Sequence, residues 1–159
     1  MISDSKKKGL QKKDYEILAE FRYTLRRFLH FSEKVALLHH LTPQHYQTLL
    51  AIEGFPGRNW LTIGELANHL QIAPHSAVGL VDRLVKSRLV CRKPHPDDKR
   101  KVRVLLTSRG LAILEKLNLV HRKELKSIGP ELSVLLRRIK EELSDDLRNS
   151  AGNSHTLYS

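Results

Sequence analysis

Between residues 61 and 86 the apolar positions follow the spacing of two short helices. The first stripe recurs at intervals of three and four, and its members share one helical face: Ile63, Leu66, Ala67 and Leu70. Thr62 precedes this stripe and Glu65 follows three residues later, the arrangement of a capping box. Residues 71–73 suffice only for a tight turn, and Pro74 suits the first position of a second helix. The pattern therefore predicts two helices joined by a three-residue turn.

The second helix divides into an apolar and a polar face. Its predicted inward residues are Ala77, Val78, Val81, Leu84 and Val85. Its predicted outward residues are His75, Ser76, Gly79, Arg83 and Lys86. Short side chains near the N-terminus can approach base edges in the major groove of DNA, while basic side chains near the C-terminus reach phosphates. An ordinary helical hairpin with a solvated polar face fits the same pattern.

The next segment favours the DNA-binding interpretation. Polar and apolar residues alternate along 89–93 and 101–106, and the residues between them are rich in Pro and Asp, so we expect a β-hairpin. Its tip carries Lys99, Arg100 and Lys101. A basic finger beside such a helix can enter a narrow minor groove, which attracts Arg, and a solvated charged loop is the alternative. Helices and hairpin together predict a winged helix-turn-helix, with residues 89–106 as the wing.

Ordered motifs in this region resemble the MarR/SlyA family of bacterial transcription regulators. They are Leu61-Thr62-Ile63-Gly64-Glu65-Leu66-Ala67, Leu80-Val81-Asp82-Arg83-Leu84, Leu89-Val90, Asp98-Lys99-Arg100 and Leu105-Leu106-Thr107. Leu41-Thr42-Pro43-Gln44 resembles the start of the family's second helix, and the resemblance covers roughly residues 14–147. It implies a homodimer that offers two winged helices to an inverted repeat. It also implies a repressor that a small molecule or an oxidant releases from DNA.

The resemblance implies roles for individual residues. The implied DNA contacts are Pro74, His75, Ser76, Gly79, Arg83 and, at the wing tip, Arg100. Their positive charge adds Lys86, Lys99 and Lys101 to the predicted DNA-binding set. Asp98 matches an acidic residue that supports the wing Arg and the recognition helix. The chain departs from the family pattern at His95, where Asp commonly precedes the wing Pro, and in the loop at residues 54–60, which is slightly longer than usual.

Two helical segments outside the winged block carry apolar stripes. The first, about residues 14–40, presents Phe21, Leu25, Phe28, Ser32 and Val35. A helix that begins near Ser108 is expected to stop at Gly129-Pro130, and a final helix then presents Leu132, Leu136, Ile139, Leu143 and Leu147. Pairing with a second copy would bury these stripes, and we predict a dimer interface at Phe21, Leu25, Phe28, Leu132, Leu136, Ile139 and Leu143. Packing onto the chain's own winged domain is the alternative, and the aromatic residues could also line an effector pocket.

Composition agrees with a nucleic-acid partner. The chain has 28 Lys and Arg against 17 Asp and Glu, which gives a formal net charge of +11 and a pI near 10.0. Such a charge attracts phosphate without selecting a sequence. Lysines before residue 14 can add phosphate contacts or serve as a solubilising tail. No apolar run is long enough to span a bilayer and no signal peptide is recognisable, so a cytoplasmic protein is expected.

Other classes of function find little support in the sequence. It contains no nucleophile elbow, no phosphate-binding Gly loop and no His-Glu-x-x-His pair, so we do not expect an enzyme or a cofactor. No metal site is predicted, although His30, His39 and His40 could meet in space. Cys91 is expected to be inert packing in a strand rather than a redox switch. A small-molecule effector, an activator and a sequence-neutral nucleoid-compacting protein remain open alternatives.

The sequence thus predicts a mainly α (α+β) fold and a ligand-responsive repressor that binds double-stranded DNA as a homodimer. The predicted organisation is a basic flexible tail at residues 1–13, a dimerisation helix at 14–41, the winged helix-turn-helix at 42–107, a long helix plus a C-terminal dimerisation helix at 108–148, and a disordered tail at 149–159.

Overall fold

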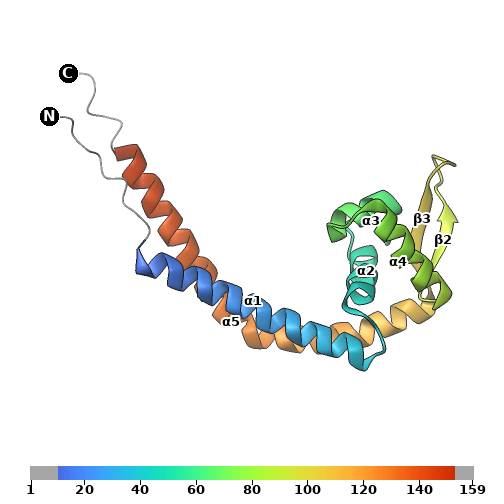
Figure 1. Ribbon diagram of the computed structural model, residues 1–159, viewed down its shortest axis with the longest axis horizontal. Helices are drawn as coiled ribbons and strands as arrows, with labels where there is room; N and C mark the ends of the chain where they lie inside the picture. The colour runs from blue at the N-terminus through green and yellow to red at the C-terminus, as the bar shows by residue number, and fades with distance from the viewer. Residues whose placement is uncertain (1–10, 153–159) are drawn as a thin grey trace, which may run out of the picture. The chain divides into compact units, whose positions relative to one another are not determined.

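In its described part the protein is mostly helical, with a small antiparallel sheet (Figure 1). The computed structural model describes residues 11–152, with side chains described for residues 11–142. The elements are α1 (Lys12–Leu38), α2 (Pro43–Glu53), β1 (Trp60–Thr62), α3 (Ile63–Leu70), α4 (Pro74–Lys86), β2 (Val90–Pro94), β3 (Val102–Leu106) and α5 (Ser108–Gly152). The mainly α (α+β) class predicted from the sequence is confirmed. The described chain divides into two compact units, one formed by residues 30–123 and the other by residues 11–29 with 124–152.

The predicted pair of short helices is present in the first of these units. Thr62 Oγ1 accepts a hydrogen bond from the Glu65 N–H at 3.3 Å, and Glu65 Oε2 accepts one from the Thr62 N–H at 2.9 Å, so the capping box begins α3. Gln71 adopts a left-handed conformation with φ of 54° and ends α3. Pro74 takes the first turn of α4. The turn at residues 71–73 therefore lies where the sequence placed it.

The buried face of α4 differs from the predicted one. Leu80 is buried and Val78 is 43% exposed, whereas the sequence pattern placed Val78 inward and omitted Leu80. Each residue turns a helix by about 100°, so Leu80 and Val78 lie on opposite sides of Ala77. The apolar stripe of this helix is wide, so the sequence does not determine how the helix is rotated about its own axis. Contacts with the rest of the unit bury the side that carries Leu80.

The predicted hairpin is the larger part of a three-stranded sheet with the order β1-β3-β2. β2 and β3 are antiparallel, with Val90 opposite Leu106 and Pro94 opposite Val102. β1 pairs with the other side of β3, with Trp60 opposite Leu105. β1 was not predicted from the sequence, because three residues are too few for a recognisable alternation of polar and apolar positions.

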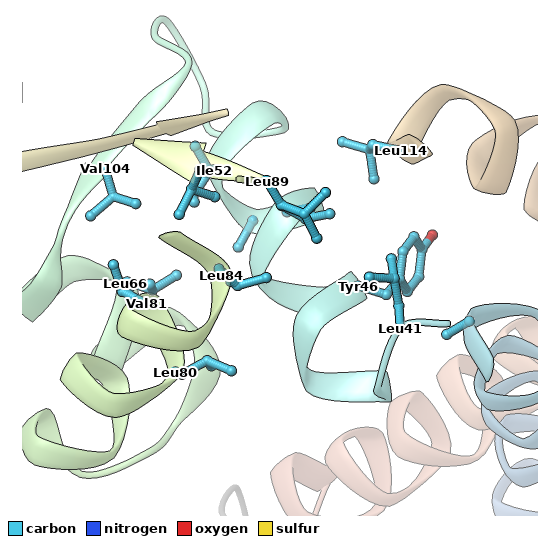
Figure 2. Packing of buried hydrophobic residues seen from close by; sticks show 14 of the residues in the cluster. Leu41, Tyr46, Ile52, Leu66, Leu80, Val81, Leu84, Leu89, Val104 and Leu114 are labelled. Atoms are coloured by element: carbon cyan, nitrogen blue, oxygen red, sulfur yellow. The ribbon is translucent and has the colours of Figure 1, made fainter. Parts of the chain in front are cut away.

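A single apolar cluster joins the helices and the sheet of the unit at residues 30–123. Its fully buried members include Leu49 and Ile52 of α2, Leu66 of α3, Leu84 of α4 and Val104 of β3. Figure 2 shows side chains from these elements meeting around Leu84 and Val81. Burying a Leu or Ile side chain stabilises a fold by about 1.5–3 kcal/mol, so this cluster holds α4 and the strands of the wing in one packed unit.

A buried imidazole holds α1, α2 and α5 together within the same unit. His121 Nε2, on α5, lies 2.9 Å from Ser32 Oγ on α1, and His121 Nδ1 lies 2.7 Å from the Leu117 carbonyl oxygen. Its ring stacks on Tyr46 of α2 at a centroid distance of 4.6 Å. Tyr46 in turn donates a hydrogen bond to Asn118 Oδ1 at 3.1 Å. The polar atoms of this cluster are therefore satisfied although the ring is buried.

In the second unit α1 and α5 are joined by polar contacts. Glu131 accepts hydrogen bonds from Thr24 Oγ1 at 2.7 Å and from Arg27 Nη1 at 3.2 Å, and Arg138 pairs with Glu20 at 2.7 Å. Ile17, Ile128 and Leu135 are buried in this unit. Together these contacts fix the pairing of the two helices.

One helix boundary predicted from the sequence is wrong. α5 runs without interruption from Ser108 to Gly152, through Gly129 and Pro130, where the sequence analysis ended one helix and began another. Pro removes one helical hydrogen bond and favours a helix end, but side-chain contacts on the following turn can hold the helix together. Glu131 bonds to α1 directly after Pro130. Helical residues also extend past position 148, and residues 153–159 lie outside the described part of the chain.

Candidate nucleic-acid interface

The predicted recognition helix presents its polar residues on one exposed face of α4. Pro74, His75, Ser76, Arg83 and Lys86 are all exposed and Gly79 is half-buried. No side chain caps the N-terminus of α4, because Ala73 stands at the N-cap position. Pro74 has no N–H and the Ser76 N–H donates to the Ala73 carbonyl at 3.0 Å, so the His75 N–H is the donor of this turn that faces water or a ligand.

Arg83 lies along this face towards the N-terminus of α4. A Cβ atom added to Gly79 would be 3.5 Å from Arg83 Nη1, so the guanidinium covers the glycine one turn earlier. The helix thus carries a cation near its middle as well as Lys86 near its C-terminal end. This arrangement suits contact with phosphates along one groove edge.

His45, at the start of α2, belongs electrostatically to the same surface and was missed by the sequence analysis. Partial burial, and then the positive charge of Arg83, lowers the pKa of His45 below its ordinary value. The imidazole is therefore held in its neutral form beside the recognition helix. No sequence signal identifies it, because the proximity of α2 to Arg83 arises only in the fold.

The wing tip is a compact turn stabilised by its own acidic residue. Asp98 Oδ1 accepts hydrogen bonds from the Arg100 N–H at 3.0 Å and from Arg100 Nε at 3.3 Å. The Arg100 N–H, with smaller contributions from the Arg100 side chain and Lys101, holds the pKa of Asp98 below its ordinary value. Arg100 remains 92% exposed, and Lys99 and Lys101 are also exposed. The tip therefore carries three cations into solvent.

A different ion pair connects the wing to the recognition helix. Arg92 Nη2 of β2 lies 2.6 Å from Asp82 Oδ1 of α4. The resemblance implied that Asp98 supports both Arg100 and the recognition helix, but the contacts of Asp98 are with Arg100 and Lys101 of the wing. Asp82 and Arg92 provide the link instead.

Beside the base of the wing, the guanidinium of Arg58 contacts two aromatic rings. The Arg58 guanidinium carbon lies 4.5 Å from the centroid of the Phe55 ring and 4.0 Å from that of Trp60. Arg58 also pairs with Glu65 of the capping box. Partial burial tends to raise the pKa of Glu65, but hydrogen bonds from Thr62 and Arg58 outweigh it and hold that pKa below the ordinary value. The carboxylate therefore stays charged and caps α3.

The residues considered for sensing do not form a metal site. Among the described residues no three His, Cys, Asp or Glu side chains are grouped so that they could hold a metal ion, and His30, His39 and His40 are no exception. Cys91 lies half-buried in β2 with a free thiol. Within the described part of the chain, no helix has the length of apolar sequence needed to cross a membrane.

Comparisons with known proteins find similarity in sequence and in structure. The MarR family model matches residues 39–101. An uncharacterised HTH-type transcriptional regulator of Bacillus subtilis strain 168, YsmB, is 37% identical over 68 residues, which are 39% of this chain and 47% of YsmB. The chain thus spans about half the length of this curated relative.

Two solved structures extend the similarity beyond the matched segment. AbsC, a MarR family transcriptional regulator from Streptomyces coelicolor, superposes with a TM-score of 0.68 at 20% identity, covering 89% of this chain and 98% of AbsC. A mutant MarR from E. coli complexed with operator DNA gives a TM-score of 0.61 at 22% identity, covering 85% of this chain and 98% of that one. At these identities the structures establish the fold.

Residues 39–101 of this chain are similar to the MarR family, and AbsC shares the fold of the chain. The resemblance recognised in the sequence is thereby confirmed. The MarR match begins just before α2 and ends at Lys101, so it contains α4 and the tip of the wing. The family consists of transcription regulators, which agrees with the expectation that the chain is not an enzyme.

The helices that flank the MarR region carry the predicted dimer residues. Leu25 and Leu136 are 39% and 51% exposed, and Phe21, Phe28, Leu132 and Ile139 are half-buried. The side chain of Leu143 lies outside the described residues. Further large apolar side chains are exposed on α1 and α5 and were not predicted: Tyr15, Leu18, Tyr23, Leu125 and Val134. The dimer interface itself stays a prediction.

Proposed function

We propose that this chain is a sequence-specific DNA-binding transcription regulator that acts as a homodimer on an inverted-repeat operator. The observation that carries the proposal is the exposed polar face of α4 beside a basic wing within one unit of the MarR-family fold. A structural relative of that fold was solved in complex with operator DNA.

In this proposal α4 lies in the major groove. His75 and Ser76 stand at its N-terminal end, where side chains meet base edges, and Gly79 follows them beneath the Arg83 guanidinium. Arg83 and Lys86 reach phosphates, which position the helix without reading sequence. Pro74 orients the first turn of the helix.

The wing extends the contact into the neighbouring minor groove. Arg100 enters it, while Lys99 and Lys101 neutralise phosphates on either side. Asp98 keeps the Arg100 backbone and guanidinium in one arrangement. The wing therefore reads groove width, and α4 reads base identity.

A second copy of the chain completes the operator-binding form. Apolar side chains on α1 and α5, Leu18 and Leu136 among them, are more than half exposed on the isolated chain, and a partner would remove them from water. Two symmetry-related α4 helices must then meet successive major grooves about 34 Å apart. The dimer helices accordingly determine the spacing of the half-sites.

Regulation follows from that spacing. A small molecule that binds one arrangement of the dimer better than another changes DNA affinity by its differential affinity for the two. A cleft of about 510 Å³ between α2 and α3, lined in part by Leu50 and His69, is large enough for such a ligand. We infer ligand-responsive repression on the family resemblance, and activation is the alternative outcome of the same binding.

The net charge of +11 favours one further candidate, a nucleoid-compacting protein that binds any duplex. Selection of binding sites from random duplex DNA at physiological salt separates the two functions. The proposal expects an enriched inverted repeat with half-sites about one helical turn apart. Selected pools without any shared motif would contradict it and favour the nucleoid protein.

A pair of charge-matched variants assigns the contact to α4. Arg83→Ala removes one cation from the recognition face, and Lys116→Ala removes one from an exposed position on α5. The Arg83 variant should lose affinity for the enriched duplex, while the Lys116 variant should bind it as the wild type does. Equal losses in both would show that only total charge matters.

A further inference from the structure

Trp60 of β1 contacts the wing at two points. Its ring meets the His95 ring edge-on, with centroids 5.2 Å apart and an interplanar angle of 83°. The guanidinium carbon of Arg103, on β3, lies 5.5 Å from the centroid of the same Trp60 ring. One aromatic side chain therefore contacts both the residue that follows β2 and a residue of β3.

These two partners hold the base of the wing tip. The His95 N–H donates to the Lys101 carbonyl at 3.1 Å, and His95 Nδ1 accepts from the Asp97 N–H at 3.2 Å. Arg103 Nε donates to the Pro94 carbonyl at 3.0 Å. Displacement of either partner would therefore disturb the turn from which Arg100 projects.

Trp60 is itself held from the opposite direction. Its backbone pairs with Leu105 in the β1–β3 ladder. Arg58 lies over its ring at 4.0 Å and pairs with Glu65, which caps α3. A chain of contacts thus runs from the first turn of α3 through Arg58 and Trp60 to His95.

We propose that Trp60 is a positioning residue for the wing: it fixes His95 and Arg103 relative to α3 and so places Arg100 for minor-groove contact. The inference rests on the proposed DNA-binding function and goes beyond it by assigning a role to a residue that does not touch DNA. It also connects the two departures from the family pattern, because the loop that ends at Trp60 and the residue at position 95 meet in this contact.

The physical need for such a residue is clear. A two-stranded hairpin is only marginally stable by itself, and Arg100 stands 92% exposed at its end. A binding residue works well only if its support holds it within about 0.5 Å of the productive position. β1 and Trp60 supply a third strand and a ring contact at the point where the hairpin leaves the core.

A double-mutant cycle tests the inference. Trp60→Ala removes the ring, and His95→Asn removes the imidazole while keeping an acceptor for the Asp97 N–H. The measured quantity is flank discrimination, the ratio of affinities for one enriched duplex with A·T-rich and with G·C-rich flanks. Each single variant should reduce this ratio by about threefold or more, and the double variant should reduce it no further than Trp60→Ala does.

Three further variants separate positioning from general damage. Trp60→Phe keeps an aromatic ring and should recover most of the flank discrimination. Val102→Ala trims an exposed apolar side chain of β3 and should leave it unchanged. Arg100→Ala should abolish it. Circular dichroism and thermal unfolding of every variant show whether the fold is retained.

The outcomes distinguish this inference from the function on which it rests. Loss of flank discrimination in Trp60→Ala at retained fold, with rescue by Phe, supports it. Suppose that the wild type shows flank discrimination and Arg100→Ala does not. Unchanged flank discrimination in Trp60→Ala would then overturn the positioning role of Trp60 alone. So would a double variant whose loss of flank discrimination equals the sum of the losses in the two single variants. A wild-type protein without flank discrimination would overturn both the role of the wing and that of Trp60.

Discussion

Gly110, in the first turn of α5, marks a point where the backbone of the wing leaves no room for a side chain. A Cβ atom at this position would lie 2.0 Å from the carbonyl oxygen of Leu89. The Thr107 N–H donates to the same oxygen at 3.0 Å, and Thr107 Oγ1 accepts from the Gly110 N–H at 3.0 Å. The start of α5 and the start of the wing are thus locked together by three residues.

Gly110→Ala should therefore destabilise the protein, by about 1–3 kcal/mol as for other overpacked sites. Gly64 is a matched control, because a Cβ there meets nothing within 4 Å and Ala is the better helix former. Urea unfolding followed by circular dichroism measures both. A Gly110 variant as stable as the Gly64 variant would contradict the close packing described here.

A pH dependence follows from His45. Burial and the charge of Arg83 lower its pKa in the folded protein, so the unfolded chain binds a proton more readily. The stabilising contribution is complete above the ordinary value of 6.5 and is lost as pH falls through the lowered pKa. His45→Gln should accordingly lose less stability than wild type between pH 8 and pH 5.5. Glu65 changes the stability of the fold only at lower pH, because its pKa lies below its ordinary 4.5. Parallel stability curves for the two proteins would remove His45 as the cause.

At the scale of elements, the sequence predicted those that have a clear period and a capping signal. The capping box of Thr62 and Glu65 and the Pro at position 74 identified both short helices. The break expected at Gly129-Pro130 was wrong, since a local rule for Pro cannot include the contacts of Glu131 with α1. β1 escaped prediction because it exists only through its pairing with β3.

The residues of the candidate site also fall into those that the sequence predicted and those that only the structure reveals. Residues on one helix face, such as His75 and Arg83, follow from spacing along a single segment. His45 and Trp60 join the site through contacts between segments distant in sequence, and no periodicity reveals them. Sequence therefore predicted the residues proposed to touch DNA, and the structure adds those that support them.

The wing supplies the element-scale prediction. Arg100→Ala should weaken binding by about 1–3 kcal/mol on operators with A·T-rich flanks and by much less on G·C-rich flanks, because a narrow minor groove concentrates negative potential. Fluorescence anisotropy on two duplexes that differ only in their flanks measures this difference. A uniform loss on both would mean that Arg100 contacts phosphate alone.

At the scale of the whole molecule, the proposed operator binding depends on a dimer. Leu136→Lys places a charge on the apolar face of α5 and should shift the protein towards monomer, which light scattering detects. Arg137→Ala, which removes only an exposed pair with Glu141, is the control and should leave the mass unchanged. A Leu136→Lys protein of unaltered mass would place the interface elsewhere.

The charge of +11 per chain bears on affinity rather than on choice of sequence. Each phosphate that the protein neutralises steepens the fall of affinity with salt, for the operator and for unrelated DNA alike. In the proposed function, sequence specificity comes from the face of α4 and from the wing. Specificity must therefore be measured as the ratio of the affinities for two DNA sequences at one salt concentration.

The most direct test of a sequence-specific regulator is the ratio of affinities for the enriched duplex and for a scrambled duplex of the same length and composition at physiological salt. Recognition by α4 and the wing predicts a ratio of about 10³ or more. A ratio near one would contradict sequence-specific regulation and leave only binding by charge.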